Sequence, residues 1–249
     1  DLHLSLRRQR QMCIRDRYKR VLLKLSGEAL IGTKDYGIDD SLISELAIQI
    51  ADLHKEKVQI IIVIGGGNFF RGSDLEKLGI QRVTADHMGM LATVINSLAL
   101  QSSLEKINSE CRVMSSIAID AVCEKYIKRR AERHLEKNRI IVLAAGTGNP
   151  FFTTDSAASL RAIELGAEIM LKGTKVDGIY DKDPIKYKDA KLFKTIPFKE
   201  VISKDLRVMD MTAVVMCQEN KMPLKVFNIL KKGNLKKSIL NDKIGTKIV

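Results

Sequence analysis

The sequence predicts an α/β protein, a three-layer α/β/α sandwich around a central, mainly parallel, twisted sheet. Two observations support this fold class. Short apolar runs alternate along the chain with segments whose apolar residues recur at helical spacing. Some runs are apolar at nearly every position, such as residues 58–64, which is typical of strands buried on both faces. Repeated alternation of this kind places helices on both faces of a parallel sheet.

Each element follows from a local signal. Residues 21–25 form a short β run that ends at Ser-Gly, and residues 58–64 form a β-branched run that stops at three glycines. Between them, Leu42, Leu46 and Ile50 recur at helical spacing after a capping aspartate. The expected strands are residues 21–25, 58–64, 112–114, 139–145, 168–172, 224–229 and 245–249. The expected helices are residues 40–56, 84–106, 120–137, 155–165, 208–220 and 234–240, and the turn-rich stretch 176–191 is expected to be a loop or hairpin over a site.

Length and composition fit one domain. The chain has 249 residues, of which 45% are hydrophobic, enough for a substantial core. Residues 1–17 are arginine-rich and lack a clear period, so we expect a non-native or disordered leader before a single domain at 18–249. No apolar run reaches the roughly 18 residues of a membrane span. The four cysteines are far apart and form no CxxC pair, which predicts neither zinc site nor disulfide framework and fits a reducing cytoplasm.

The net charge of +12 is open to more than one interpretation. A solvated, lysine-rich surface is the simplest, and attraction of anionic nucleotides is the functional alternative. Nucleic-acid binding is less well supported because the basic residues are scattered. The densest stretch, residues 126–133, has helical spacing and neighbouring acids, which favours a charged helix face.

A loop at residues 146–155 (GTGNPFFTTD) carries the richest chemistry. It lies between an expected strand and an expected helix, and it combines glycines, threonines, an amide, two aromatic rings and a carboxylate. Glycines allow a ligand to approach the backbone, while hydroxyl and N–H groups can hold an anion. The carboxylate of Asp155 would repel a phosphate unless a metal or lysine lay between them. The loop therefore predicts a phosphorylated substrate, with Asp155 placed for chemistry.

Two further segments point to phosphate chemistry. Lys24 lies near the end of a strand, just before Ser26 and Gly27, where an ammonium could neutralise a transferring phosphoryl group, although an outward-facing charge is the alternative. The turn at residues 65–72 (GGGNFFRG) follows a buried strand, offers several N–H donors and includes Arg71 for phosphate oxygens. The sequence has no GxxxxGK[ST] motif, no Rossmann glycine spacing and no protein-kinase signature.

Asp86 opens the segment 86–93 (DHMGMLAT) at the start of an expected helix. One interpretation is a first-turn acid favoured by the helix dipole. The other is a carboxylate that accepts hydrogen bonds from ligand hydroxyls, as acids that bind ribose do.

Four motifs together resemble a known family. The segments 23–30 (LKLSGEAL), 65–72, 86–93 and 146–155 are similar to those of the amino-acid kinase family, in its bacterial uridylate kinase branch. The resemblance runs from about Tyr18 to Val249. It implies the amino-acid kinase fold and transfer of the γ-phosphoryl group of ATP to UMP, giving UDP and ADP in pyrimidine nucleotide biosynthesis, with ATP and Mg²⁺ as cofactors.

The resemblance also implies the site residues. The catalytic set would be Lys24, Arg71, Asp155 and Asp210. The ATP-binding set would be Lys24, Ser26, Gly27, Gly67, Arg71, Thr174, Tyr180 and Asp183. The UMP-binding set would be Gly66, Asp86, Thr147, Gly148, Asn149, Pro150, Phe151, Phe152, Thr153 and Thr154. Mg²⁺ would be held through the nucleotide phosphates, with Asp155 or Asp210 as a protein ligand, and Gly173 departs from the alanine frequent in the family.

Assembly and regulation are implied in the same way: a cytoplasmic homohexamer, activated by GTP and inhibited by UTP, with no membrane and no required nucleic acid. A region tied to the GTP response in some members corresponds to Gly32, Thr33, Lys34, Asp35, Tyr36 and Gly37. Three alternatives stay open: a kinase of the same fold with a carboxylate or carbamate acceptor, a catalytically silent nucleotide sensor, and a basic nucleic-acid-binding regulator.

Overall fold

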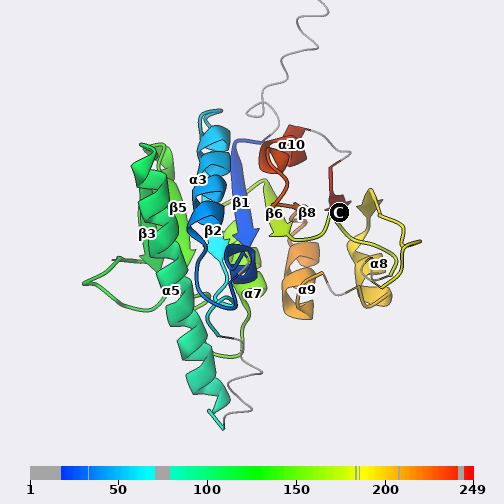
Figure 1. Ribbon diagram of the computed structural model, residues 1–249, viewed down its shortest axis with the longest axis horizontal. Helices are drawn as coiled ribbons and strands as arrows, with labels where there is room; N and C mark the ends of the chain where they lie inside the picture. The colour runs from blue at the N-terminus through cyan, green and yellow to red at the C-terminus, as the bar shows by residue number, and fades with distance from the viewer. Residues whose placement is uncertain are drawn as a thin grey trace, which may run out of the picture.

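The computed structural model describes residues 18–249 apart from 33, 71–78, 183, 185, 207 and 241–243 (Figure 1). The strands are β1 (Arg20–Leu25), β2 (Gln59–Ile64), β3 (Cys111–Ser115), β4 (Glu124–Lys125), β5 (Ile140–Ala144), β6 (Ile169–Thr174), β7 (Thr195–Ile196), β8 (Leu224–Asn228) and β9 (Thr246–Ile248). Within the described residues they form one nine-stranded sheet in the order β4-β3-β5-β2-β1-β6-β8-β9-β7. Neighbouring strands are parallel except β8 and β9, which confirms the predicted mainly parallel sheet.

Helices cover both faces of this sheet. They are α3 (Asp40–His54), α5 (Arg82–Lys106), α6 (Lys128–Glu136), α7 (Thr154–Glu164), α8 (Phe198–Ser203), α9 (Met211–Glu219) and α10 (Asn234–Leu240), with a 3-10 turn η1 (Gly27–Leu30). Figure 1 shows α3, α5 and α10 on the near face, in front of the strands. Successive strand residues point to opposite faces, so β1 sends Leu23 into the core under α3 and α5 and Leu22 into the core under α6 to α9. The predicted three-layer sandwich is confirmed.

Two predicted segments differ from the structure. The helix expected over 120–137 is wrong in its first part, because residues 124–125 form edge strand β4, which pairs with β3, and α6 begins only at Lys128. The helix expected from 208 begins at Met211, because the carboxylate of Asp210 caps it by accepting from the Ala213 N–H. β7 and α8 were not expected, since two-residue and six-residue elements are too short to give a periodic signal.

The topology gathers the predicted loops at one edge. β1, β2, β5 and β6 are parallel, so their carboxyl ends meet on the same side of the sheet. In open α/β sheets ligands bind at that edge. Of the helices that the structure describes, none combines the length and apolar character needed to cross a membrane.

Candidate active site

Two lysines lie side by side at the carboxyl ends of the central strands. Lys24 in β1 is the register partner of Lys172 in the neighbouring strand β6. Each lysine lies two residues after a residue that packs under α7, Leu22 in β1 and Met170 in β6, so it shares their face of the sheet and its ammonium group points toward that helix. The sheet therefore places two positive charges next to each other in a largely buried position.

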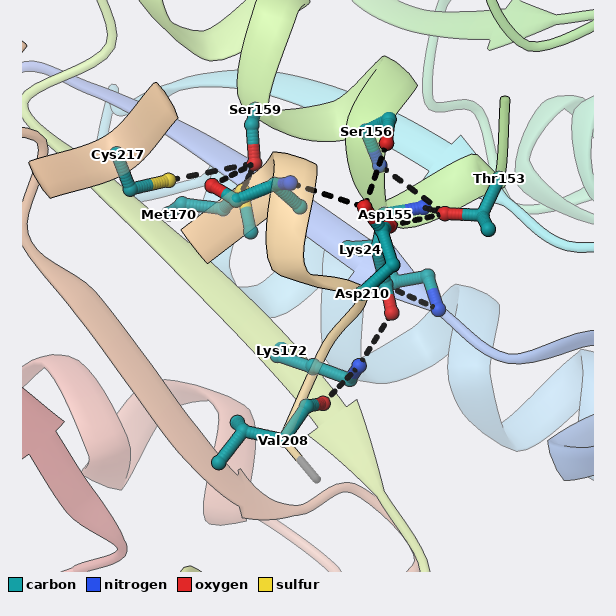
Figure 2. Close-up of polar contacts among 11 residues, drawn as sticks. Lys24, Thr153, Asp155, Ser156, Ser159, Met170, Lys172, Val208, Asp210 and Cys217 are labelled. Atoms are coloured by element: carbon teal, nitrogen blue, oxygen red, sulfur yellow. Dashed lines mark hydrogen bonds and ion pairs between the residues drawn. The ribbon is translucent and has the colours of Figure 1, made fainter. Parts of the chain in front are cut away.

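Asp155 in the first turn of α7 joins these two lysines (Figure 2). Its Oδ1 lies 2.6 Å from Lys24 Nζ, and its Oδ2 lies 2.6 Å from Lys172 Nζ. All three side chains are at most 14% exposed. Lys172 Nζ also donates to the carbonyl oxygen of Val208. One carboxylate thus fixes the separation and direction of two ammonium groups.

The surroundings shift two of these ionisation equilibria. Burial opposes ionisation of Asp155, but the charges of Lys24 and Lys172 outweigh it and hold the pKa of this carboxyl below its usual range. Burial lowers the pKa of Lys172, Asp155 offsets part of that effect, and the neighbouring charge of Lys24 lowers the pKa further. The ionised carboxylate is therefore the favoured state, whereas Lys172 gives up its proton more easily than an exposed lysine.

Asp210 lies beside the two lysines and Asp155, and it connects α7 to α9. Its Oδ1 accepts from Ser156 Oγ at 2.9 Å and from the Ala213 N–H at 2.9 Å. Its Oδ2 accepts from the hydroxyl of Thr153, which also caps α7 by accepting from the N–H groups of Asp155 and Ser156. The second acid predicted from the sequence is thus locked between the starts of two helices (Figure 2).

The glycine turns after β1 and β2 are in direct contact. A Cβ added to Gly27 would lie 2.6 Å from the carbonyl oxygen of Gly65 and 2.8 Å from the N of Gly67, so only glycine fits there. Asn68 holds the second turn, because its Nδ2 donates to the carbonyl of Gly37 at 2.9 Å and to Asn96 Oδ1 at 2.8 Å. Asn96 Nδ2 donates in turn to the carbonyl of Gly65 at 2.7 Å.

A cavity of about 310 Å³ opens between α5 and the loop after β5, and we call it the acceptor cavity. It brings together most of the predicted UMP-binding residues, together with residues of α5. Its lining residues are Gly66, Gly67, Phe70, Ala85, Asp86, Gly89, Met90, Thr93, Gly146, Thr147, Asn149, Phe152, Thr153 and Thr154. The cavity has both polar groups and two aromatic rings, as a site for a base and a phosphate requires.

Asp86 holds the loop of this cavity from the helix side. It lies one turn inside α5, which begins at Arg82, so the expectation that it opens the helix is wrong. Its Oδ2 accepts from the backbone N–H of Phe151 at 2.8 Å, and both of its oxygens accept from Arg82 Nε at 3.0 and 3.1 Å. The Phe151 ring is 67% exposed and lies under the Arg82 guanidinium.

A second cavity, of about 530 Å³, lies beside the carboxyl end of β6, and we call it the donor cavity. The first part of the turn-rich stretch 176–191 lines one side of it, and Tyr180 in that part forms an antiparallel bridge with Leu192. The lining residues are Thr174, Val176, Gly178, Ile179, Tyr180, Asp181, Lys182, Pro184, Asp205, Leu206, Val208 and Val226. Lys172 donates to Val208, which lines the donor cavity, and Asp210 accepts from Thr153, which lines the acceptor cavity. The charged residues Lys24, Lys172, Asp155 and Asp210 therefore lie between the two cavities.

Not every predicted residue is found at a cavity wall. Gly148, Pro150 and Phe151 do not line the acceptor cavity, and Gly148 packs against Ser116 instead. Ser26 and Gly27 form the turn beside Gly65. Of the suspected effector segment, Gly32, Lys34, Asp35 and Tyr36 are exposed, and Gly37 is bound to Asn68. Arg71, Asp183 and Thr33 lie outside the described residues.

Lys172 is the residue that sequence reasoning missed. A lysine in a short apolar strand resembles an outward-facing charge. The available signal was its place, two residues before Thr174, at the same end of a strand as Lys24 in β1. The sequence does not show that the two lysines are neighbours, because this follows from the pairing of β1 with β6.

The acidic groups suit Mg²⁺ held mainly by phosphates. Among the residues that the structure describes, no three His, Cys, Asp or Glu side chains gather into a metal cage. Mg²⁺ is commonly bound through one or two carboxylates together with substrate phosphates. Asp155 is flanked by two ammonium groups, which would repel a cation, whereas the three donors to Asp210 are uncharged, which leaves Asp210 as the better candidate.

Comparison with known proteins agrees with this geometry. The sequence profile of the amino acid kinase family matches residues 19–228. The uridylate kinase of Dichelobacter nodosus is 53% identical over 230 residues, which are 92% of this chain and 95% of that protein. The uridylate kinase of Methylococcus capsulatus is 54% identical over 232 residues, 93% of this chain and 97% of that protein.

Solved structures show the same architecture. The UMP kinase of Bacillus anthracis superposes with a TM-score of 0.90 at 39% identity, covering 93% of this chain and 96% of that one. The UMP kinase of Ureaplasma parvum gives a TM-score of 0.88 at 39% identity, covering 93% and 99%. With its family profile, its relatives over nearly full length and its sheet topology in agreement, the chain belongs to the amino acid kinase family.

Proposed function

We propose that the chain transfers the γ-phosphoryl group of ATP to UMP, giving UDP and ADP, as a nucleoside monophosphate kinase of pyrimidine nucleotide biosynthesis. Curated relatives at 53% and 54% identity that carry the name uridylate kinase support this activity. The structural observation that carries it is the pair Lys24 and Lys172, joined by Asp155 between two cavities. A silent nucleotide sensor would not need two buried ammonium groups held in this way.

The cavities divide between the two nucleotides. UMP occupies the acceptor cavity, where Gly66, Asp86 and the loop 147–154 supply groups for phosphate, ribose and uracil. ATP occupies the donor cavity, where Thr174 and Tyr180 border adenine and ribose. Asp183, outside the described residues, is assigned to the same nucleotide by the family resemblance alone. The ATP phosphates extend toward Ser26, Gly27 and Gly67, and Arg71, outside the described residues, is assigned to them by the family resemblance alone. This division is supported by two contacts: Asp210 accepts from Thr153, which lines the acceptor cavity, and Lys172 donates to Val208, which lines the donor cavity.

The reaction needs positioning and charge compensation more than a base. An oxygen of the UMP phosphate forms the new bond to the γ-phosphorus, while the bond from that phosphorus to the oxygen bridging the β- and γ-phosphates breaks. The attacking oxygen is already anionic at neutral pH, so no general base is required. Lys24 and Lys172 compensate the negative charge of the transferring group, and Asp155 keeps both ammonium groups oriented.

Mg²⁺ is the proposed metal cofactor, with Asp210 as its protein ligand beside the nucleotide phosphates. When bound, it supplies further neutralisation of charge on the β- and γ-phosphates. Asp210 keeps unused acceptor capacity, because a carboxylate offers about four lone-pair sites and the structure gives it three donors, namely Thr153, Ser156 and Ala213.

The proposal extends to assembly and regulation as a single-domain, cytoplasmic homohexamer that responds to GTP and UTP. An exposed apolar stripe on α5, formed by Val83, Leu91 and Ile95, supports association between copies of the chain. The hydrogen bonds between Gly37 and Asn68 support an effector role for residues 32–37, because they link that segment to the glycine turn. Light scattering with and without GTP or UTP tests both points.

An acceptor panel tests the proposed reaction. UMP, CMP, aspartate and carbamate are each supplied with ATP and Mg²⁺, and release of ADP is followed. UMP should support turnover far above the other three. Turnover with aspartate or carbamate alone would assign another acceptor within the same fold. Salt-dependent binding to duplex DNA without turnover would favour a nucleic-acid-binding regulator.

A further inference from the structure

The acceptor loop begins with a residue in an unfavourable backbone conformation. Ala145 directly follows β5 and has φ of +61°, in the left-handed region that residues with a Cβ seldom adopt. Gly146 follows with φ of +58°. Such residues keep their conformation only where the surroundings hold it, and they gather at functional sites. Some contact must therefore hold Ala145, which is completely buried.

Within the loop, the Gly148 N–H donates to the carbonyl of Ala145 at 2.9 Å, and Thr93 supplies the contact that comes from α5. Its Oγ1 accepts from the backbone N–H of Ala145 at 2.8 Å and donates to the carbonyl of Met90 at 2.6 Å. The second bond fixes the direction of the hydroxyl, so its lone pair points at Ala145. Thr93 is 3% exposed and forms part of the wall of the acceptor cavity.

The same turn of α5 also presses against the other side of the cavity. A Cβ added to Gly66 would lie 2.8 Å from the carbonyl oxygen of Gly89 and 3.3 Å from the N of Thr93. The backbone of α5 at this point is thus in contact with the glycine turn after β2, while the Thr93 side chain holds the loop after β5. α5 sets the distance between the two walls.

We propose that Thr93 is a positioning residue for the phosphoryl acceptor: its hydroxyl holds Ala145 in the left-handed conformation and thereby fixes the loop 146–154 against UMP. The inference rests on the proposed function, because it takes UMP as the occupant of the acceptor cavity. Loss of the hydroxyl leaves a buried N–H without its acceptor, and Ala145 relaxes toward negative φ. The walls of the donor cavity contain no α5 residue among those described, so ATP binding is unaffected.

The chain offers a matched set of variants for the test. Thr93→Val keeps the branched shape and deletes the hydroxyl, while Thr93→Ser keeps the hydroxyl and deletes the methyl group. Ser97→Ala deletes another buried hydroxyl of α5, one that donates to the Thr93 carbonyl within the same helix. KM for UMP, KM for ATP, kcat and Tm are measured for each.

For Thr93→Val we expect KM for UMP to rise on the order of tenfold, the effect of losing one buried hydrogen bond, with KM for ATP within about twofold of the parent. Thr93→Ser should restore KM for UMP to within about threefold. Ser97→Ala should lower Tm without changing either KM. If Thr93→Val does not fold, Thr93→Ala makes the same deletion with a smaller side chain.

Three results would overturn the proposal: an unchanged KM for UMP in the hydroxyl-free variants, an equal rise in both KM values, or no rescue by serine. Failure of the proposed function is a separate outcome. In that case the parent protein itself shows no UMP-dependent release of ADP. If another acceptor supports turnover, the hydroxyl-free Thr93 variants should still bind that acceptor more weakly, because the conformation of Ala145 does not depend on which acceptor is used.

Discussion

Lys24 and Lys172 are register partners on neighbouring parallel strands, and their ammonium groups bind opposite oxygens of the Asp155 carboxylate. Two like charges on adjacent strands would repel each other in a buried position. The carboxylate between them offsets this repulsion and holds the two ammonium groups in a fixed arrangement that can bind a further anion. Phosphoryl transfer requires such compensation of charge on the transferring group.

The first prediction concerns Lys24. Lys24→Ala removes an ammonium that compensates charge in the transition state, so kcat should fall on the order of a hundredfold or more, while KM for UMP changes little. Steady-state kinetics with saturating ATP measure this. A kcat equal to that of the parent would remove Lys24 from the catalytic group.

The second prediction concerns Lys172, which the sequence did not reveal. Lys172→Met keeps an unbranched chain of similar length and deletes the charge, and kcat should fall on the order of tenfold to a hundredfold. Lys194→Met is the matched control, because Lys194 is exposed beside the far edge strand β7. Equal kcat values for the two variants would show that Lys172 serves packing alone.

The third prediction uses the lowered pKa of Lys172. Catalysis needs the protonated form, so activity should decline with rising pH at a value below the ordinary lysine pKa of 10.5. In Lys172→Arg the guanidinium stays charged throughout, and this alkaline decline should move to higher pH even if kcat is reduced. Superimposable pH profiles of kcat/KM for the two proteins would contradict this assignment.

The fourth prediction concerns stability. Asp155→Asn leaves two buried ammonium groups without their counter-charge and should lower the free energy of unfolding at neutral pH by about 3 to 5 kcal/mol. The pKa of Asp155 is lowered in the folded state, so its contribution is complete above its unfolded value, near pH 4, and is lost as pH falls through the folded value. Urea unfolding of both proteins from neutral to acid pH should show a difference in the free energy of unfolding that narrows as the pH falls below about 4. A difference independent of pH down to acid unfolding would point to packing instead.

The fifth prediction concerns Asp86. Asp86→Asn weakens the acceptor of the Phe151 N–H and the proposed contact to ribose hydroxyls, so KM for UMP should rise about tenfold with kcat less affected. Isothermal titration with UMP in the absence of ATP separates binding from turnover. Parent-like affinity in that titration would exclude Asp86 from the acceptor site.

Much of the fold could be predicted because its signals are local. The apolar run 58–64 and the helical spacing in 40–56 correspond to β2 and α3, and Lys24 and Asp155 lie in motifs that suggest phosphate chemistry. Lys172 could not be predicted, since its role depends on the pairing of β6 with β1 rather than on its neighbours in sequence.

Other misses have the same cause. β4 exists because residues 124–125 pair with β3, and this pairing overrides the helical spacing of the sequence around it. Thr93 lies inside a motif recognised from the sequence, but its hydroxyl acquires a partner only when α5 packs against the end of β5. Local patterns thus locate the site, and tertiary contacts select which side chains complete it.

The central claim is transfer of the γ-phosphoryl group of ATP to UMP by the lysine pair. Phosphorus NMR of a reaction containing ATP, UMP and Mg²⁺ follows the transferred group directly. The account predicts that UDP and ADP appear in equal amounts with the parent protein, and that the rate of both falls together in Lys24→Ala. Formation of ADP and inorganic phosphate without UDP, or of UDP at the parent rate in Lys24→Ala, would contradict it.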